Sequence, residues 1–240
     1  MNISKTNYVL FVPPDNIKIH DPTLNNEYKL EFGSETIDQV SHVKFLGLKI
    51  DKNLNWSVHA NDLIDTLSSC LYMMNNVKNF LPKHTMKSLY YSFFYSHLSL
   101  GILLWGPSIS KWHQEKLKVK QNFAVRSIMK ANSRASTANF YKDLSILKFD
   151  DIVNLELCKF MFRVNRNEIP PNVTKFFNNY QHDYRTRYNH ESKFDQRRNF
   201  QIVNESFLSV APHNFSRLSV NVRNSPSVKS FAKIFKKMCN

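Results

Sequence analysis

The stretch "HVKFLGLKIDKNLNWSVH" (residues 42–59) contains the point at which the chain changes from strand-like to helical patterning. Before Trp56, apolar residues occur in short runs separated by Pro, Gly and Asn, a pattern typical of strands. After Trp56, they recur at three- and four-residue spacing as far as Pro82, which predicts an amphipathic helix. The chain is therefore predicted to be α+β, with a small β segment at residues 1–55 followed by a mainly helical part.

The β segment contains four short apolar runs: "YVLFV" (8–12), "IKI" (17–19), "YKLEF" (28–32) and "VKFLGLKI" (43–50). Proline, glycine and asparagine-rich turns separate them. We expect three or four strands of a small antiparallel sheet.

The segments after Pro82 predict further helices. A helix at 83–105 is apolar almost all round and should lie centrally. The next, at 109–131, should have an apolar side with Trp112, Phe123, Ala124 and Ile128 and a cationic side with Lys116, Lys120, Arg126 and Lys130. Helices are also expected at 138–145 and 151–165, before Pro170 and Pro171 stop the pattern. Residues 172–240 predict a poorly ordered basic tail with one short helix at 226–237.

The charge of the chain predicts a polyanionic partner. The formal net charge is +14 and the pI is about 9.7. Residues 111–134 carry seven basic side chains against one acid, and residues 163–240 carry fourteen against five, so the remainder is close to neutral. Nucleic acid is the first candidate partner and an anionic membrane surface the second. A solvated helix face would explain either stretch alone.

Cysteines and targeting signals exclude several classes of protein. Cys70, Cys158 and Cys239 are far apart and fit neither a disulfide framework nor a zinc site, which favours a reducing compartment. The N-terminus does not resemble a secretory signal, so we expect a protein that is not secreted. Residues 89–105 lack charged side chains but are short for a membrane span, so a core helix is predicted and no membrane association.

Six motifs occur in a collinear order. They are "NISKT" (2–6), "KFLGLKID" (44–51), Trp56 with His59, "LYYSFFYSHLSLGILLWG" (89–106), "KLKVKQNFAVRSIM" (116–129) and "DYRTR" (183–187). In this order they resemble the C-terminal part of the reverse transcriptase of a non-LTR (LINE-type, jockey-like) retrotransposon, the part that follows the catalytic aspartates. Leu100 stands where the family usually has tyrosine, and Ser219 replaces a proline in the weakly similar end of the chain.

The resemblance implies a role for each region. Residues 1–55 would be the end of the palm, 56–134 a helical thumb-like domain, and 135–240 a C-terminal helical and basic region. Lys5 would be the auxiliary catalytic lysine near the incoming triphosphate. Phe45, Leu46 and Gly47 would form the primer grip. Nucleic-acid-binding candidates on the thumb are Lys116, Lys118, Lys120, Arg126 and Lys130.

Asp150 and Asp151 in "KFDDIV" superficially resemble the aromatic-x-Asp-Asp signature of the same family. A two-metal polymerase needs carboxylates that converge on one point. These two directly precede an apolar helical run, where aspartates satisfy free backbone N–H groups and the positive end of the helix dipole. We therefore interpret them as helix-start residues and predict no metal site. His59 is likewise interpreted as a packing or capping residue.

These inferences define one leading hypothesis and two alternatives. The leading hypothesis is a fragment of an RNA-directed DNA polymerase that binds RNA/DNA template-primer, pairs with the missing palm and fingers, and is inactive alone. Magnesium is expected only in the full-length polymerase, with no cofactor bound by this chain. Met1 falls inside a family motif, which favours a truncated element or gene model. The alternatives are a host-retained nucleic-acid-binding adaptor and a non-functional relic. The resemblance implies a nuclear location, with the cytoplasm as the alternative.

Overall fold

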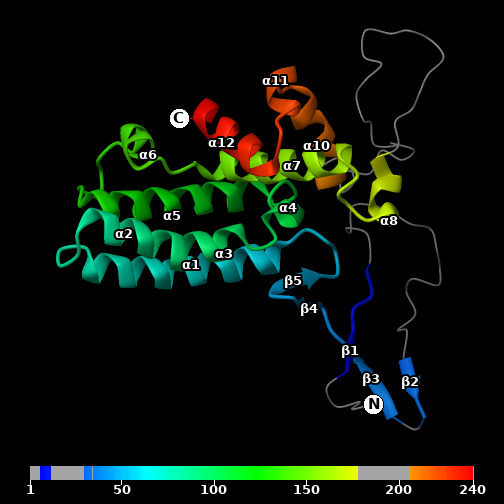
Figure 1. Ribbon diagram of the computed structural model, residues 1–240. Coiled ribbons are helices and arrows are strands. Elements are labelled where there is room, and N and C mark those ends of the chain that lie inside the picture. The colour runs from blue at the N-terminus through cyan, green and yellow to red at the C-terminus, as the bar shows by residue number, and fades with distance from the viewer. Residues whose placement is uncertain (1–5, 12–29, 34, 178–205, 240) are drawn as a thin grey trace.

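The protein is an α+β fold in which short N-terminal strands lead into a stack of helices (Figure 1). The computed structural model describes residues 6–11, 30–33, 35–177 and 206–239. The strand-to-helix change lies where the sequence places it, because the last strand ends at Asp51 and the first helix begins at Ser57. The predicted fold class is confirmed.

Within the described residues, five short strands form two separate sheets. Strands β1 (Asn7–Tyr8), β2 (Leu30–Phe32) and β3 (Glu35–Gln39) lie in the order β1-β3-β2, whereas β4 (His42–Phe45) and β5 (Leu48–Asp51) form a hairpin. The pairings are antiparallel except that β1 runs parallel to β3. Local patterning does not reveal this long-range parallel contact. The strand expected at 17–19 lies outside the described residues.

The helices after β5 follow the predicted segments. Helix α1 (Ser57–Val77) is followed by α2 (Lys83–Leu89), the π-helical segment η3 (Tyr90–Tyr95), α3 (Ser96–Ser99) and α4 (Ile102–Trp105). Then come α5 (Lys111–Met129), α6 (Ala138–Leu144) and α7 (Phe149–Asn165). The single helix expected at 83–105 is thus interrupted twice, by a π-helical turn and by a break at residues 100 and 101.

The break between α3 and α4 has a steric reason. Leu100 is extended, with ψ 112°, and Gly101 has φ 61°, in the left-handed region that glycine adopts at no cost. A Cβ atom on Gly101 would lie 2.7 Å from Cδ1 of Leu48, so β5 packs directly against the glycine. The indole N–H of Trp105 donates to the carbonyl oxygen of Leu100 at 2.8 Å and satisfies a group that the break leaves free.

The C-terminal region contains more helix than its pattern predicts. After α8 (Pro171–Thr174) and η4 (Lys175–Phe177), the structure has α10 (Phe207–Ser216), α11 (Val220–Arg223) and α12 (Val228–Cys239). Helix α12 corresponds to the helix expected at 226–237. Helices α10 and α12 both pack against α7 (Figure 1). The motif at 183–187 lies outside the described residues.

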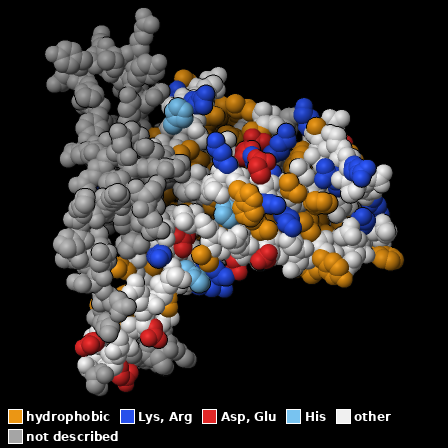
Figure 2. Space-filling model, turned by 180° about the vertical axis from the view of Figure 1, so that it is seen from behind, with side chains coloured by type: hydrophobic (Ala, Val, Ile, Leu, Met, Phe, Trp, Pro, Cys, Tyr) orange, Lys and Arg blue, Asp and Glu red, His pale blue; other side chains and the backbone are white. Residues whose placement is uncertain are grey.

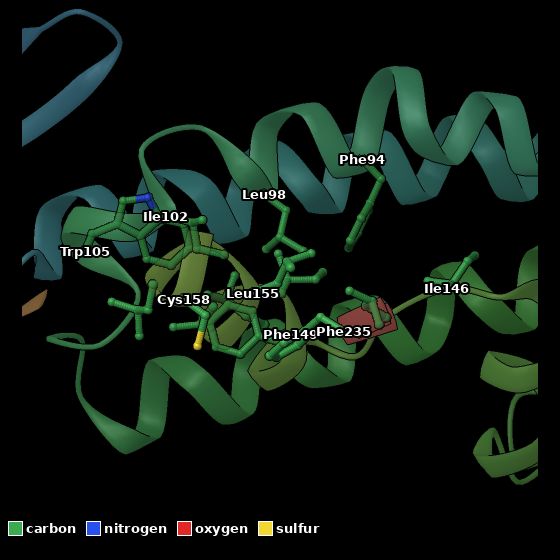
Figure 3. Packing of buried hydrophobic residues seen from close by; sticks show 14 of the residues in the cluster. Phe94, Leu98, Ile102, Trp105, Ile146, Phe149, Leu155, Cys158 and Phe235 are labelled. Atoms are coloured by element: carbon green, nitrogen blue, oxygen red, sulfur yellow. The ribbon is translucent and has the colours of Figure 1, made fainter. Parts of the chain in front are cut away.

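The core lies between the central helices, as Figure 3 shows. Phe94, Leu98, Ile102 and Trp105 are buried in the same cluster as residues of α7 and α12, among them Phe149, Leu155, Cys158 and Phe235. The prediction that residues 89–105 form a core segment is confirmed. No helix among the described residues is long and apolar enough to cross a membrane. The cluster joins buried residues from both 56–134 and 135–240, and the division into these two domains stays a prediction.

The close contact between Gly101 and Leu48 predicts the cost of adding a single methyl group. Gly101→Ala should lower the free energy of unfolding by about 1–2 kcal/mol for the left-handed backbone. The overlap with Leu48 should add about 1–3 kcal/mol. Urea unfolding followed by tryptophan fluorescence measures both effects, because Trp105 lies four residues away in α4.

The double variant Leu48→Ala, Gly101→Ala separates the two contributions. Removing the Leu48 side chain should eliminate the overlap, so Gly101→Ala should cost only the backbone contribution in that background. Equal costs in the two backgrounds would show that the contact between Leu48 and Gly101 contributes nothing.

Candidate nucleic-acid interface

Helix α5 carries a stripe of exposed aromatic and cationic side chains. The α5 stripe consists of Trp112, Lys116, Val119, Phe123, Arg126 and Lys130. Their spacing alternates between three and four residues, which places them along one side of a helix. Trp112, Val119 and Phe123 are 58%, 47% and 44% exposed, which is unusual for side chains of this size.

The cations of the stripe lie over its aromatic rings. Nζ of Lys116 is 5.3 Å from the centre of the Trp112 ring, and Cζ of Arg126 is 5.7 Å from that of Phe123. The prediction that Trp112 and Phe123 lie on the apolar side of this helix is therefore wrong. The inner face of α5 is filled by other residues: Leu117, Gln121, Ala124, Val125 and Ile128. Both rings are left at the surface beside the cations.

The five basic candidates on α5 differ in whether a carboxylate or a backbone oxygen already binds the charged group. Lys118 lies 3.1 Å from Glu115 and 3.0 Å from Asp150, so carboxylates already neutralise it. Nε of Arg126 donates to the carbonyl oxygen of Ala135 at 2.8 Å, which leaves its terminal nitrogens as further donors. Within the described ranges, Lys116, Lys120 and Lys130 have no carboxylate partner. Figure 2 shows Lys and Arg side chains interspersed with hydrophobic ones on one face of the helical part.

The β4–β5 hairpin projects apolar side chains at its tip. Leu46 and Gly47 have φ of 48° and 87°, the two positive values that a tight type I′ turn requires. Phe45 and Leu46 are 61% and 81% exposed, whereas Leu48 is buried. A Cβ atom on Gly47 would lie 3.0 Å from Cδ2 of Leu100, so the turn approaches the helix break closely. The predicted grip residues thus form an exposed tip on an anchored base.

His59 links this hairpin to the helices. Its Nδ1 accepts a hydrogen bond from the backbone N–H of Lys49 at 3.5 Å, and its ring lies edge-on to Trp105, 5.5 Å between centroids. Burial lowers the pKa of His59, with opposing effects from the nearby charges of Asp62 and Lys49. The interpretation of His59 as a packing residue is confirmed by its 5% exposure and these contacts.

Asp51 shapes the connection from β5 to α1. One oxygen of its buried carboxylate accepts the backbone N–H groups of Asn53 and Asn55 at 3.2 and 3.1 Å. Leu54 and Trp56 have positive φ in this tight connection. The Asp51 carboxylate therefore replaces the backbone partners that a regular strand or helix would supply.

Gln121 and Tyr90 join two helices in the core. The side-chain amide of Gln121 donates to the hydroxyl oxygen of Tyr90 and to the carbonyl oxygen of Leu147, both at 2.9 Å. Burial strongly raises the pKa of Tyr90 and keeps its hydroxyl neutral. The Gln121 position of the basic motif therefore has a structural role, while exposed positions of the same helix remain available to a partner.

Asp150 and Asp151 lie in the first turn of α7, after the N-cap residue Lys148, which confirms the helix-start interpretation. Asp150 pairs with Lys118. Burial raises the pKa of Asp151, against an opposing effect of Lys148. In the part of the chain that the structure describes, His, Cys, Asp and Glu side chains do not gather in threes or more to hold a metal. Lys5 lies outside the described residues.

The buried His59 predicts a pH-dependent contribution to stability. The unfolded state takes up a proton at His59 near pH 6.5. The folded state does so at lower pH, so stability is lost as the pH falls below this value. Asn should accept the N–H of Lys49 without titrating, and His59→Asn should remove this component. Urea unfolding at pH 7.5, 6.5 and 5.5 measures it.

His84→Asn provides the matched control, because the His84 side chain is exposed at the surface of α2. It should leave the pH dependence of the wild-type protein unchanged. An identical pH dependence in His59→Asn and the wild type would contradict the assignment to His59.

Comparison with protein-family models, with curated proteins and with solved structures found no match for this chain.

Proposed function

We propose that this chain is a fragment of the RNA-directed DNA polymerase of a mobile element and contributes template-primer binding without the catalytic aspartates. The α5 stripe carries the proposal, because it combines cations with exposed rings on one helix face. Lysine and arginine neutralise phosphates. Aromatic side chains stack on unpaired bases. This combination fits nucleic acid better than it fits a membrane surface.

The connection between the α5 stripe and the hairpin also supports the proposal. Helix α1 packs against both β5 and α5. The ion pair between Lys49 and Asp62, at 2.6 Å, joins β5 to α1, and His113 at the start of α5 hydrogen-bonds Asn61 of α1 at 3.2 Å. The hairpin tip and the stripe are thus held by one helix, as two contacts to one extended ligand require.

The three-stranded sheet supports the view that a further protein portion belongs here. Leu30 and Phe32 are 47% and 55% exposed, all three residues of β2 are exposed, and Phe11, which follows β1 outside the sheet, is 52% exposed. Strands with large apolar side chains on an uncovered sheet are normally buried by another layer. The missing palm and fingers would provide that layer, together with the carboxylates that hold Mg²⁺. Primer extension by residues 1–240 alone would contradict the proposal.

A host-retained adaptor is the second candidate. Its supporting observation is the continuous core that joins α1, α5 and α7. Helices with such a core can present the α5 stripe without the palm. The same core disfavours a relic that folds poorly. Restoration of polymerase activity by an added palm and fingers portion would favour the fragment, whereas duplex binding without such restoration would favour the adaptor.

Binding to an RNA/DNA duplex should depend on the free lysines of α5. The double variant Lys116→Ala, Lys130→Ala, which removes two lysines of the α5 stripe, should bind about tenfold more weakly at 100 mM salt. The slope of log affinity against log salt should fall by about two, since each phosphate contact contributes about one. Fluorescence anisotropy over a salt series measures both quantities.

Lys118→Ala is the control on the same helix, because Glu115 and Asp150 already neutralise Lys118. It should change affinity by less than about twofold. A loss for Lys118→Ala equal to that of the double variant would show that net charge, and not the α5 stripe, governs binding.

Trp112 should contribute through stacking on unpaired bases. Trp112→Leu should weaken binding of single-stranded RNA by about 1–3 kcal/mol. It should have little effect on a blunt duplex, whose bases are already stacked. Anisotropy with the two substrates tests the difference. Tyr72→Leu, an exposed aromatic on α1, is the control and should affect neither substrate.

A further inference from the structure

A pocket of about 440 Å³ lies where the end of α7 meets α10 and α11. Arg166, Arg223, Asn165, Asn224 and Ser225 supply its polar lining. Phe162 and Phe215, both buried, supply an apolar floor. None of the residues lining the pocket is an acid. The pocket therefore has two positive charges and amide donors over a floor of low polarity, which strengthens attraction to an anion.

Arg166 is held in place at the rim of this pocket. Nη1 donates to the carbonyl oxygens of Ser225 and Pro226, at 3.3 and 3.1 Å. Nε lies 3.1 Å from Glu168, and the guanidinium lies 5.3 Å from the centre of the Phe162 ring. Nη2 takes no part in these contacts within the described residues, so an oriented donor remains. Glu168 reduces the charge of Arg166 but does not line the pocket.

Arg223, unlike Arg166, has a buried side-chain donor without an acceptor among the described residues. Its Nε is buried, and among the described residues it has no hydrogen-bond partner. A buried N–H of a charged group that makes no hydrogen bond costs free energy. Because this Nε is closed to solvent, a phosphate in the pocket would accept hydrogen bonds from the terminal nitrogens of Arg223. Arg223 ends the short helix α11, and its backbone N–H donates to Ser219 at 3.1 Å, which fixes where the side chain starts.

We propose that this pocket binds the phosphate group of a nucleotide, either free or at the end of a nucleic-acid strand. Guanidinium groups match the oxygens of phosphate with parallel hydrogen bonds. The volume exceeds that of a phosphate alone and lies in the range of small-ligand pockets, so a nucleoside attached to the phosphate has room beside the apolar floor. The site is built from α7, α10 and α11, and it is separate from the α5 stripe.

Isothermal titration of residues 1–240 with AMP, adenosine and sodium phosphate tests the proposal at constant ionic strength. The wild-type protein should bind AMP saturably and adenosine at least about tenfold more weakly. Arg223→Gln should weaken AMP binding at least about tenfold. Equal binding of AMP and adenosine, or equal binding of AMP by Arg223→Gln and wild type, would overturn it.

Two further variants make the result specific. Arg217→Gln removes the same charge from an exposed position outside the pocket and should bind AMP as the wild type does. Asn224→Asp keeps the side-chain shape but adds a carboxylate to the lining, so it should also weaken AMP binding. Because Asn224 is exposed, this variant tests the site even if Arg223→Gln does not fold. Unchanged AMP binding by Asn224→Asp would count against the pocket.

Oligonucleotides with and without a 5′-phosphate distinguish the two sources of the ligand. Arg223-dependent preference for the phosphorylated strand end, together with weak AMP binding, assigns the site to strand ends. Arg223-dependent AMP binding without that preference assigns it to free nucleotides. Arg223→Gln should leave the salt dependence of duplex binding through the α5 stripe unchanged. The pocket proposal and the proposed function can therefore fail independently of each other.

Discussion

The packing of Leu48 against Gly101 holds the hairpin to the helices. The side chain of Leu48 occupies the space that a Cβ atom on residue 101 would take, and the helix break at residues 100 and 101 opens that space. His59 also holds β5 to the helices, because its Nδ1 accepts the backbone N–H of Lys49 and its ring contacts the ring of Trp105. The ion pair between Lys49 and Asp62 adds to this packing, and together these contacts fix the hairpin relative to the helices.

The packing of the β4–β5 hairpin against the helices also explains why motifs far apart in the sequence occur together in this chain. Gly47 and Asp51 shape the two turns that flank β5. His59 hydrogen-bonds the backbone of this strand and contacts Trp105. Gln121 lies deeper, where it hydrogen-bonds Tyr90 and the backbone after α6. These motif residues thus maintain the arrangement of hairpin and helices, whereas exposed motif residues such as Phe45 and Lys116 are ones that a ligand can reach.

Sequence patterning predicts the helices well and their surfaces less well. The spacing of Leu63, Leu67, Cys70 and Met74 predicts α1 because burial on one face follows the helical period. The sequence predicts Trp112 and Phe123 on the apolar side of this helix, opposite its cations, yet both are exposed and Leu117 and Ala124 fill the buried face of α5. The break at Gly101 depends on contact with Leu48, more than fifty residues earlier, which local patterning cannot register.

The C-terminal helices and the candidate site show the same limit. Pro212 within α10 and the short length of α11 weaken their helical patterns, and packing against α7 compensates. The neutralisation of Lys118 requires Asp150 from another helix, so charge counting alone could not separate it from Lys116. The arginine-lined pocket likewise combines α7 with α11, and only the tertiary structure brings Arg166 and Arg223 together.

Local energetics distinguish the two basic helices. Lys236 and Lys237 lie in the last turn of α12, where the helix dipole favours positive charge, so stability alone explains them. In α5, Lys116 lies before the last turn and is exposed over the Trp112 ring, so the helix dipole does not explain its position. A cation over an exposed ring, at a position that stability alone does not explain, is the reason why the proposed nucleic-acid contact is assigned to α5 and not to α12.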